Sequence, residues 1–166
     1  MSAKSATVTL DGKHLRFVGR TGSGHRLVID DREGDTGPAP SELIPLALAG
    51  CTAMDVISIL RKKRQDVEHY EVSATGTQRD EPPALFTRID VVHELRGPGL
   101  DVEAVRRAIE LSATRYCAVG STLATGVTEI HHAYIVIDEH GEHHTGEMVV
   151  LGPLGHVEVM APVGIA

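Results

Sequence analysis

An almost wholly apolar segment, residues 46–60 with the sequence LALAGCTAMDVISIL, constrains the fold of this chain more than any other feature. Ser41 precedes it as a typical helix N-cap, and Glu42 is favourable in a positively charged first turn. Pro45 falls in that first turn, where a missing N–H is tolerated. The basic run at 61–64 suits the negative end of a helix. We therefore predict a helix that is buried on several sides.

The segment before this helix predicts a three-stranded meander. Alternating residues mark strands at 6–10, 15–18 and 25–30, and the Asp-Gly pair between the first two is a strong hairpin signal. Residues 31–40 are polar and rich in glycine and proline, so they predict a loop.

The segment after the helix predicts a strand pair, a second helix and a further strand. Residues 67–77 and 85–95 show partial alternation and resemble an antiparallel pair. Asp101 is expected to cap a helix over 102–116, and a strand is expected at 128–137.

This order of elements indicates an α+β fold with mainly antiparallel strands rather than a repeated βαβ array. The length of 166 residues suits one domain. We expect the domain over residues 1–137. Residues 138–166 are expected to form a C-terminal extension of the same domain, as a β-hairpin or a partly flexible tail.

The composition disfavours several classes of partner. Sixteen basic against 23 acidic residues give a net charge of −7, which argues against nucleic acid or an anionic membrane as a partner. No apolar run approaches the roughly 18 residues that a membrane-spanning helix needs. The first residues, MSAK, are not followed by the apolar region of a secretory signal. We therefore expect a cytoplasmic protein.

Two cysteines, Cys51 and Cys117, carry the chemical interest of the chain. Two thiols cannot build a four-thiolate zinc site or an iron–sulfur cluster. A static disulfide is also unexpected in a cytosolic protein. Two interpretations stay open, namely small residues packed inertly in a core and a pair of redox-active thiols.

A reactive Cys51 requires a cation from another part of the chain. The residue lies too far from the helix N-terminus to profit from the helix dipole. Asp55 lies one turn further on the same face, and an unpaired carboxylate there would raise the pKa of the thiol. Arg16, Arg20 and Arg26 of the meander are candidates for the compensating charge.

Several of the ten histidines invite a metal interpretation. A solvated loop explains the polar segment 138–147 without a ligand, and a metal carrier is the remaining alternative. His131 and His132 are adjacent on a predicted strand, so they should point to opposite faces of the sheet. The histidines of the polar segment are His140, His143 and His144, accompanied by Glu139 and Glu142.

Two cysteine-centred segments resemble the signatures of the OsmC/Ohr family. The first comprises 37–43 (GPAPSEL) and 47–56 (ALAGCTAMDV). The second, within 107–123, contains RAI, LS, YCAV and STL in this order. The stretch 17–25 also resembles the OsmC-like branch, and the similarity extends in order over about residues 6–137.

The resemblance implies a fold and an activity. The fold would be an intertwined homodimer whose sheets wrap around long central helices, with sites at the subunit interface. The activity would be thiol-dependent reduction of organic hydroperoxides without metal, flavin or haem. Cys51 would be the peroxidatic residue, Cys117 the resolving residue, and a dithiol would reduce their disulfide. The alternative is a non-enzymatic relative that binds a hydrophobic small molecule at the dimer interface.

The sequence departs from the family pattern near the peroxidatic cysteine. Peroxidase members carry an arginine in the N-terminal part and a glutamate shortly before the cysteine. Ser41 stands at the position of that glutamate, and Glu42 is offset by one, about 180° around a regular helix from Cys51. Arg20 is the preferred match for the arginine. Asp55 is either a site residue that pairs with this arginine or a hydrogen-bonded core acid.

Overall fold

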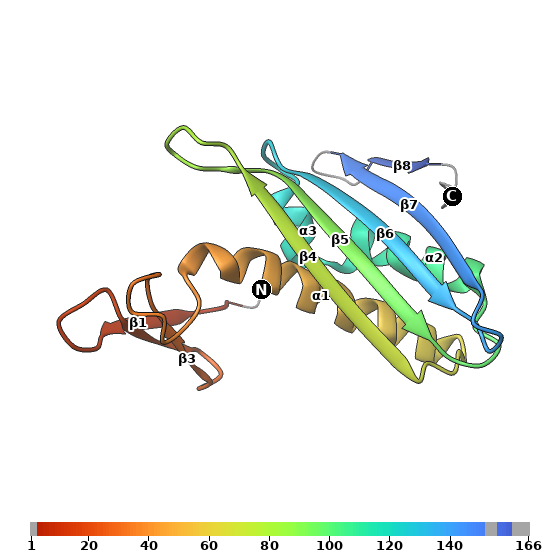
Figure 1. The fold of residues 1–166 in the computed structure, drawn as a ribbon, viewed down its shortest axis with the longest axis horizontal. Helices are drawn as coiled ribbons and strands as arrows, with labels where there is room; N and C mark the ends of the chain where they lie inside the picture. Colours follow the sequence, from red (N-terminus) through yellow and green to blue (C-terminus); the bar gives the residue numbers. More distant parts are fainter. Residues whose placement is uncertain (1–2, 152–155, 161–166) are drawn as a thin grey trace. The chain divides into compact units, whose positions relative to one another are not determined.

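The computed structural model describes residues 3–151 and 156–160. The chain divides into two compact units, Met1–Ile44 and Pro45–Ala166 (Figure 1). Each unit is built around its own sheet. The division proposed at residue 137 stays a prediction.

The first unit contains the predicted meander. Its strands β1 (Ala6–Leu10), β2 (Phe17–Thr21) and β3 (Arg26–Ile29) form an antiparallel sheet in the order β1-β2-β3. Gly12, in the turn between β1 and β2, has a φ of 95°, a conformation that glycine adopts without steric cost. The meander predicted from alternation is confirmed.

The start of the long helix differs from the prediction. A 3₁₀ turn, η1 (Pro40–Glu42), precedes α1 (Leu43–Lys62), and Ser41 lies inside this turn rather than at a cap. Pro40 opens the turn because its fixed φ suits a first helical position. The Glu42 carboxylate accepts a hydrogen bond from the Ala39 N–H at 2.7 Å. Glu42 thus stabilises the turn at the start of α1.

The second unit contains a mixed five-stranded sheet in the order β4-β5-β6-β7-β8. All neighbouring strands are antiparallel except β5 and β6, which are parallel. The predicted α+β class is confirmed, and the parallel pair is an addition to it. The strands are β4 (His69–Gln78), β5 (Phe86–Arg96), β6 (Glu129–Ile137), β7 (His143–Leu151) and β8 (His156–Met160).

A helical crossover connects β5 to β6 and makes their parallel pairing possible. It consists of α2 (Val102–Leu111), a π-helical turn η2 (Ser112–Tyr116) and α3 (Ala118–Leu123). The single helix predicted over 102–116 is therefore α2 with the π turn. The short helix α3 was not predicted.

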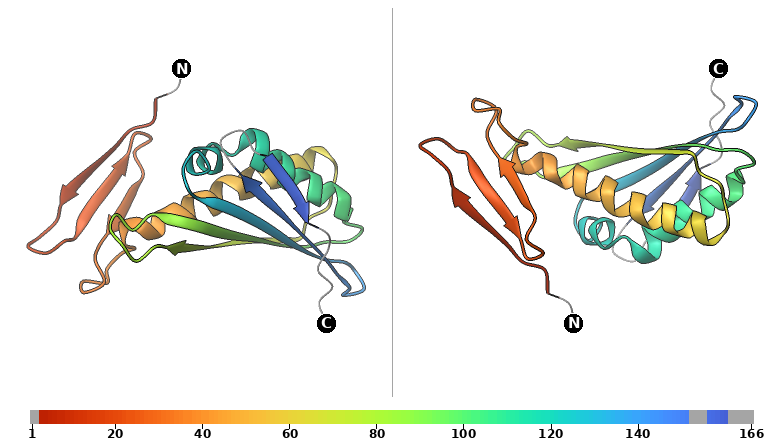
Figure 2. Two further views of the ribbon diagram at one scale, coloured as in Figure 1. Left: turned by 90° about the horizontal axis from the view of Figure 1, so that it is seen from above. Right: turned by 90° about the horizontal axis from the view of Figure 1, so that it is seen from below.

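The helices of the second unit lie on one face of its sheet (Figure 2). Burial alternates along β5 and β6, and the buried positions face the helices. The hydrophobic core forms between these two layers. Its fully buried members include Val56, Leu60, Leu95, Val105, Ile109 and Val136.

The expectation that α1 is buried on several sides is wrong for this single chain. One stripe of the helix, which includes Leu48 and Leu60, packs into the core. On the opposite side the side chains of Leu46 and Met54 are 63% and 74% exposed. The helix therefore presents a second apolar face that the described residues of the second unit do not cover.

By length and composition alone, the helical segment Pro40–Lys62 could also cross a membrane. An 18-residue window in it has a mean hydropathy of 2.0, so the expectation that no segment approaches this limit is wrong. The window average tolerates polar residues such as Asp55, which interrupt a strictly apolar run. One such helix is weak evidence for a membrane, because core helices of soluble proteins pass the same test.

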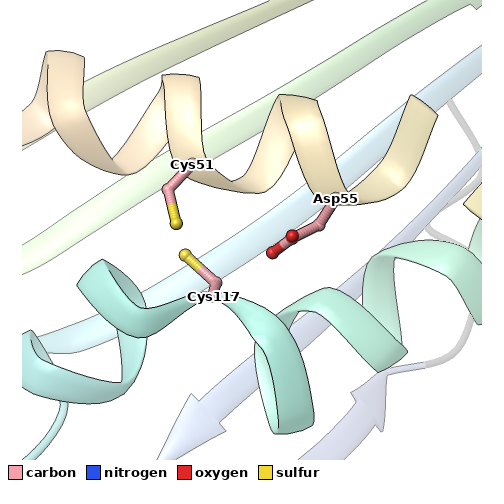
Figure 3. A group of neighbouring side chains, drawn as sticks. All are labelled: Cys51, Asp55 and Cys117. Atoms are coloured by element: carbon pink, nitrogen blue, oxygen red, sulfur yellow. The ribbon is translucent and has the colours of Figure 1, made fainter. Parts of the chain in front are cut away.

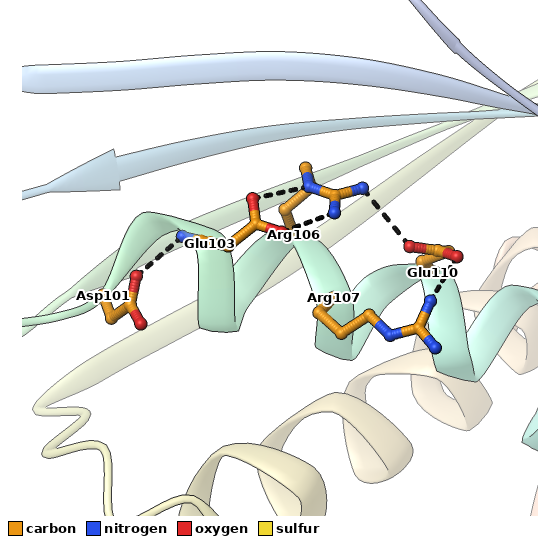
Figure 4. Close-up of polar contacts among 5 residues, drawn as sticks. All are labelled: Asp101, Glu103, Arg106, Arg107 and Glu110. Carbon is orange, nitrogen blue, oxygen red and sulfur yellow. Dashed lines mark hydrogen bonds and ion pairs between the residues drawn. The ribbon is translucent and has the colours of Figure 1, made fainter.

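The predicted cap of α2 is confirmed. The Asp101 carboxylate accepts a hydrogen bond from the Glu103 N–H at 2.9 Å (Figure 4). We expect Asp101→Ala to lower the free energy of unfolding by about 1 kcal/mol, because a helix N–H loses its partner. Asp101→Asn, which retains a capping oxygen, should change it by only a few tenths. Urea unfolding of both variants checks this, and equal losses would contradict a capping role.

Candidate thiol site

The structure brings together three residues that the sequence had singled out. Cys51 and Asp55 lie one turn apart on α1, and Cys117 lies between η2 and α3. Their two sulfurs and a carboxylate oxygen are all within 4.8 Å of one another (Figure 3). Both cysteines are free thiols. The two thiols therefore form one site although they are distant in the sequence.

Cys117 forms hydrogen bonds with the backbone around it. Its N–H donates to the Ser112 carbonyl at 2.8 Å, where the π turn ends. Its sulfur accepts a hydrogen bond from the Gly120 N–H at 3.3 Å and so caps α3. A Cβ on Gly120 would lie 3.4 Å from both this sulfur and the Leu48 side chain, so glycine allows the close approach.

The two thiols differ in their surroundings. Cys117 is 1% exposed, whereas Cys51 is half-buried. Burial is the main cause that raises the pKa of the Cys117 thiol to about 12. The Gly120 N–H lowers this pKa, while Cys51 and Asp55 raise it further. Cys117 is thus a protonated thiol at neutral pH in the reduced chain.

A buried row of hydroxyl groups holds Asp55 in place. Ser112 donates to the Asp55 carboxylate at 3.1 Å, and its oxygen lies 3.1 Å from the Thr52 hydroxyl. Both hydroxyl residues are completely buried. Neither was singled out in the sequence, because their burial is visible only in the structure.

A cavity of about 360 Å³ adjoins this site. Asp55 lines it on one side, together with Lys62 and Lys63 of the same chain segment and Tyr116 of the π turn. Lys62 and Lys63 therefore bring positive charge to the same cavity that the Asp55 side chain lines.

The remaining candidates lie in the first unit. Arg16 pairs with Asp11 and also donates to Thr36 at 3.0 Å. Arg20 and Arg26 are direct partners across β2 and β3 and line a cavity of about 450 Å³. The roles of Arg20 and Glu42 in activating Cys51 stay predictions.

The histidine segment is partly a strand. His143 and His144 belong to β7, so the expected loop extends only to Glu142. The Asp138 carboxylate accepts from the backbone N–H groups of His140 and Glu142 and lies 3.1 Å from His144 Nε2. These contacts explain the cluster as a structured turn.

A second buried polar row crosses the sheet beneath the helices. Tyr70 Oη lies 2.8 Å from His93 Nδ1, and His93 Nε2 lies 3.2 Å from His132 Nδ1. Burial is the main cause that lowers the pKa of both histidines, to about 4 for His132. Burial likewise raises the pKa of Tyr70. All three side chains are therefore neutral at neutral pH.

Known proteins match most of this chain. The model of the OsmC-like protein family matches residues 32–131, which include both cysteines. The chain belongs to the OsmC family. Protein YhfA of Escherichia coli K12 is 44% identical over 123 residues, which cover 74% of this chain and 91% of YhfA. The resemblance found in the sequence is thereby confirmed.

Solved structures share the fold. A structure from structural genomics is 40% identical, with a TM-score of 0.74, over 81% of this chain and 98% of its own. The organic hydroperoxide resistance protein OhrB of Bacillus subtilis is 18% identical, with a TM-score of 0.54, over 78% of this chain and 97% of its own. At this identity the OhrB match shows a common fold alone.

Proposed function

We propose that this OsmC-family chain is a thiol-dependent peroxidase that reduces organic hydroperoxides. The observation that carries the proposal is the pair of free thiols, Cys51 and Cys117, which α1 and the crossover hold side by side. Their different exposure suits two different roles, in which the more exposed Cys51 attacks the peroxide and the buried Cys117 forms the disulfide. The name of the related OhrB, an organic hydroperoxide resistance protein, supports the choice of substrate class.

In the first step the Cys51 thiolate attacks the O–O bond of the hydroperoxide. The sulfur takes one oxygen and becomes a sulfenic acid, and the other oxygen leaves with a proton as the alcohol. Cys51 is assigned this role because it is the more exposed thiol. Cys117 is almost inaccessible and protonated, which makes it a poor first nucleophile.

In the second step Cys117 attacks the Cys51 sulfenic acid. The S–S bond forms, and the thiol proton leaves with the hydroxyl as water. A dithiol then reduces the disulfide by exchange and is itself oxidised to a disulfide. Over one cycle, a hydroperoxide and a dithiol become an alcohol, water and the oxidised dithiol.

The proposal includes a cytoplasmic homodimer. The exposed apolar face of α1, with Leu46 and Met54, is the surface that a second chain would cover. Arg20 is proposed to supply the positive charge that a Cys51 thiolate needs. In the metal-free protein, Asp55 is proposed to pair with this arginine.

Mass spectrometry under non-reducing conditions tests the proposal. Reduced protein is mixed with a few equivalents of cumene hydroperoxide, and both the intact mass and the peptides are measured. We expect rapid loss of two hydrogens, a Cys51–Cys117 linked peptide, and full reversal by a dithiol. Thiols that remain unmodified after minutes would contradict the mechanism and favour the alternative of a hydrophobic ligand bound at the dimer interface.

A further inference from the structure

The thiol site has the composition of a metal-binding site as well as that of a redox pair. Two sulfurs and one carboxylate oxygen converge from two segments of the chain, with all three donor atoms within 4.8 Å of one another. Thiolate sulfur and carboxylate oxygen are both ligands that zinc accepts in proteins. Among the described residues, one other group of this kind is present, at Asp138, Glu142 and His144, and it contains no sulfur.

The spacing of the donors is close to that of a tetrahedral zinc site. With Zn–S bonds of about 2.3 Å, two sulfur ligands lie about 3.8 Å apart. The two sulfurs, which are within 4.8 Å of each other, therefore need to approach by no more than about 1 Å. Cys51 and Asp55, one helical turn apart, already project from the same face of α1.

The site also concentrates negative charge once its thiols ionise. When a metal displaces the thiol protons, the two thiolates and the carboxylate carry three negative charges in a half-buried place. Within residues 45–151 and 156–160 of the second unit, no lysine or arginine forms an ion pair with Asp55. A divalent cation would offset most of this charge.

The surroundings meet two further requirements of a metal site. The hydrogen bond from Ser112 fixes the orientation of Asp55, as outer-shell partners do for metal-bound carboxylates. The cavity lined by Asp55 and Tyr116 gives access from outside to one of the three donor residues, Asp55.

We propose that Cys51, Cys117 and Asp55 bind one zinc ion in the reduced protein. Binding releases the two thiol protons, and a water molecule completes the fourth position. The metal and the disulfide exclude each other, because both need the same two sulfurs. The reduced thiols are therefore held in a protected state until the metal leaves. Zinc binding does not depend on the proposed peroxidase activity.

Titration of metal-free, reduced, full-length protein tests the proposal. Zinc is added in competition with a chromogenic chelator, and cobalt replaces it in a parallel titration that monitors thiolate-to-cobalt charge-transfer absorption. We expect one ion per chain. Affinity should fall by at least about 100-fold in Cys51→Ser and Cys117→Ser, and by about 10-fold to 100-fold in Asp55→Asn.

His144→Ala serves as the matched control, because it disrupts the sulfur-free group and leaves the thiols intact. Its affinity should equal that of the unchanged protein. In addition, zinc should slow alkylation of both thiols by N-ethylmaleimide, which needs no variant. Undiminished zinc affinity in Cys51→Ser, loss of binding in His144→Ala alone, or absence of cobalt charge transfer would overturn the proposal.

Discussion

Cys51→Ser is expected to reduce dithiol-dependent consumption of cumene hydroperoxide by at least about 1,000-fold, to the uncatalysed background. The hydroxyl of serine cannot accept an oxygen atom as a thiolate sulfur does. Cys117 cannot take over, because it is 1% exposed and burial raises its pKa to about 12. Continuous measurement of peroxide loss, with thioredoxin or dithiothreitol as the reductant, gives the rate.

Cys117→Ser provides the complementary result. In the absence of a reductant, this variant should consume about one equivalent of peroxide and then stop with a sulfenic acid on Cys51, which a cyclic diketone reagent labels. Thermal unfolding confirms that both variants are folded. Turnover retained in Cys51→Ser, or a label on Cys117 in the unchanged protein, would show that the roles of the two thiols are wrongly assigned.

Acidification is expected to destabilise the protein through the buried histidine row. Folding holds His93 and His132 neutral, whereas the unfolded chain binds protons on both below about pH 6.5. Above pH 6.5 the protonation of these histidines does not reduce the free energy of unfolding. As the pH falls from 6.5 towards the folded-state pKa, about 4 for His132, protonation of the unfolded chain lowers that free energy. For His132 alone this amounts to about 3 kcal/mol, and His93 adds to it in the same direction.

Urea unfolding between about pH 7 and pH 4 measures this effect. His132→Asn removes the titration and keeps a polar atom for the contact with His93, so its unfolding free energy should depend less on pH. His143→Asn is the control, because His143 is exposed on β7. An unchanged pH dependence in His132→Asn would show that His132 does not carry the acid sensitivity.

Local features of the fold could be predicted from the sequence because local patterns determine them. The alternation of β4 and β5, the cap at Asp101 and the apolar α1 each depend on neighbouring residues in the chain. The opposite orientations of His131 and His132 also follow from the period of a strand, and the structure confirms them, since His132 is buried and His131 is not.

Features that depend on distant segments could not be predicted in this way. The parallel pairing of β5 with β6 results from the path of the crossover, and no period in either strand records it. Alternation places His93 on the inner face but does not show that Tyr70 and His132 meet it. Similarly, the proximity of the two cysteines was expected only from the family resemblance, because the spacing of two residues in the sequence does not show that they are in contact.

The hydrogen bond from Gly120 to the sulfur of Cys117 makes α3 sensitive to the chemical state of that sulfur. A thiol, a thiolate and a disulfide sulfur differ in their strength as acceptors, so the first turn of α3 tightens or frays with each change. The donor is a backbone amide, which every substitution except proline retains. The amide proton of Gly120 is therefore a built-in spectroscopic reporter, whose chemical shift and exchange rate follow the state of the site without any added label.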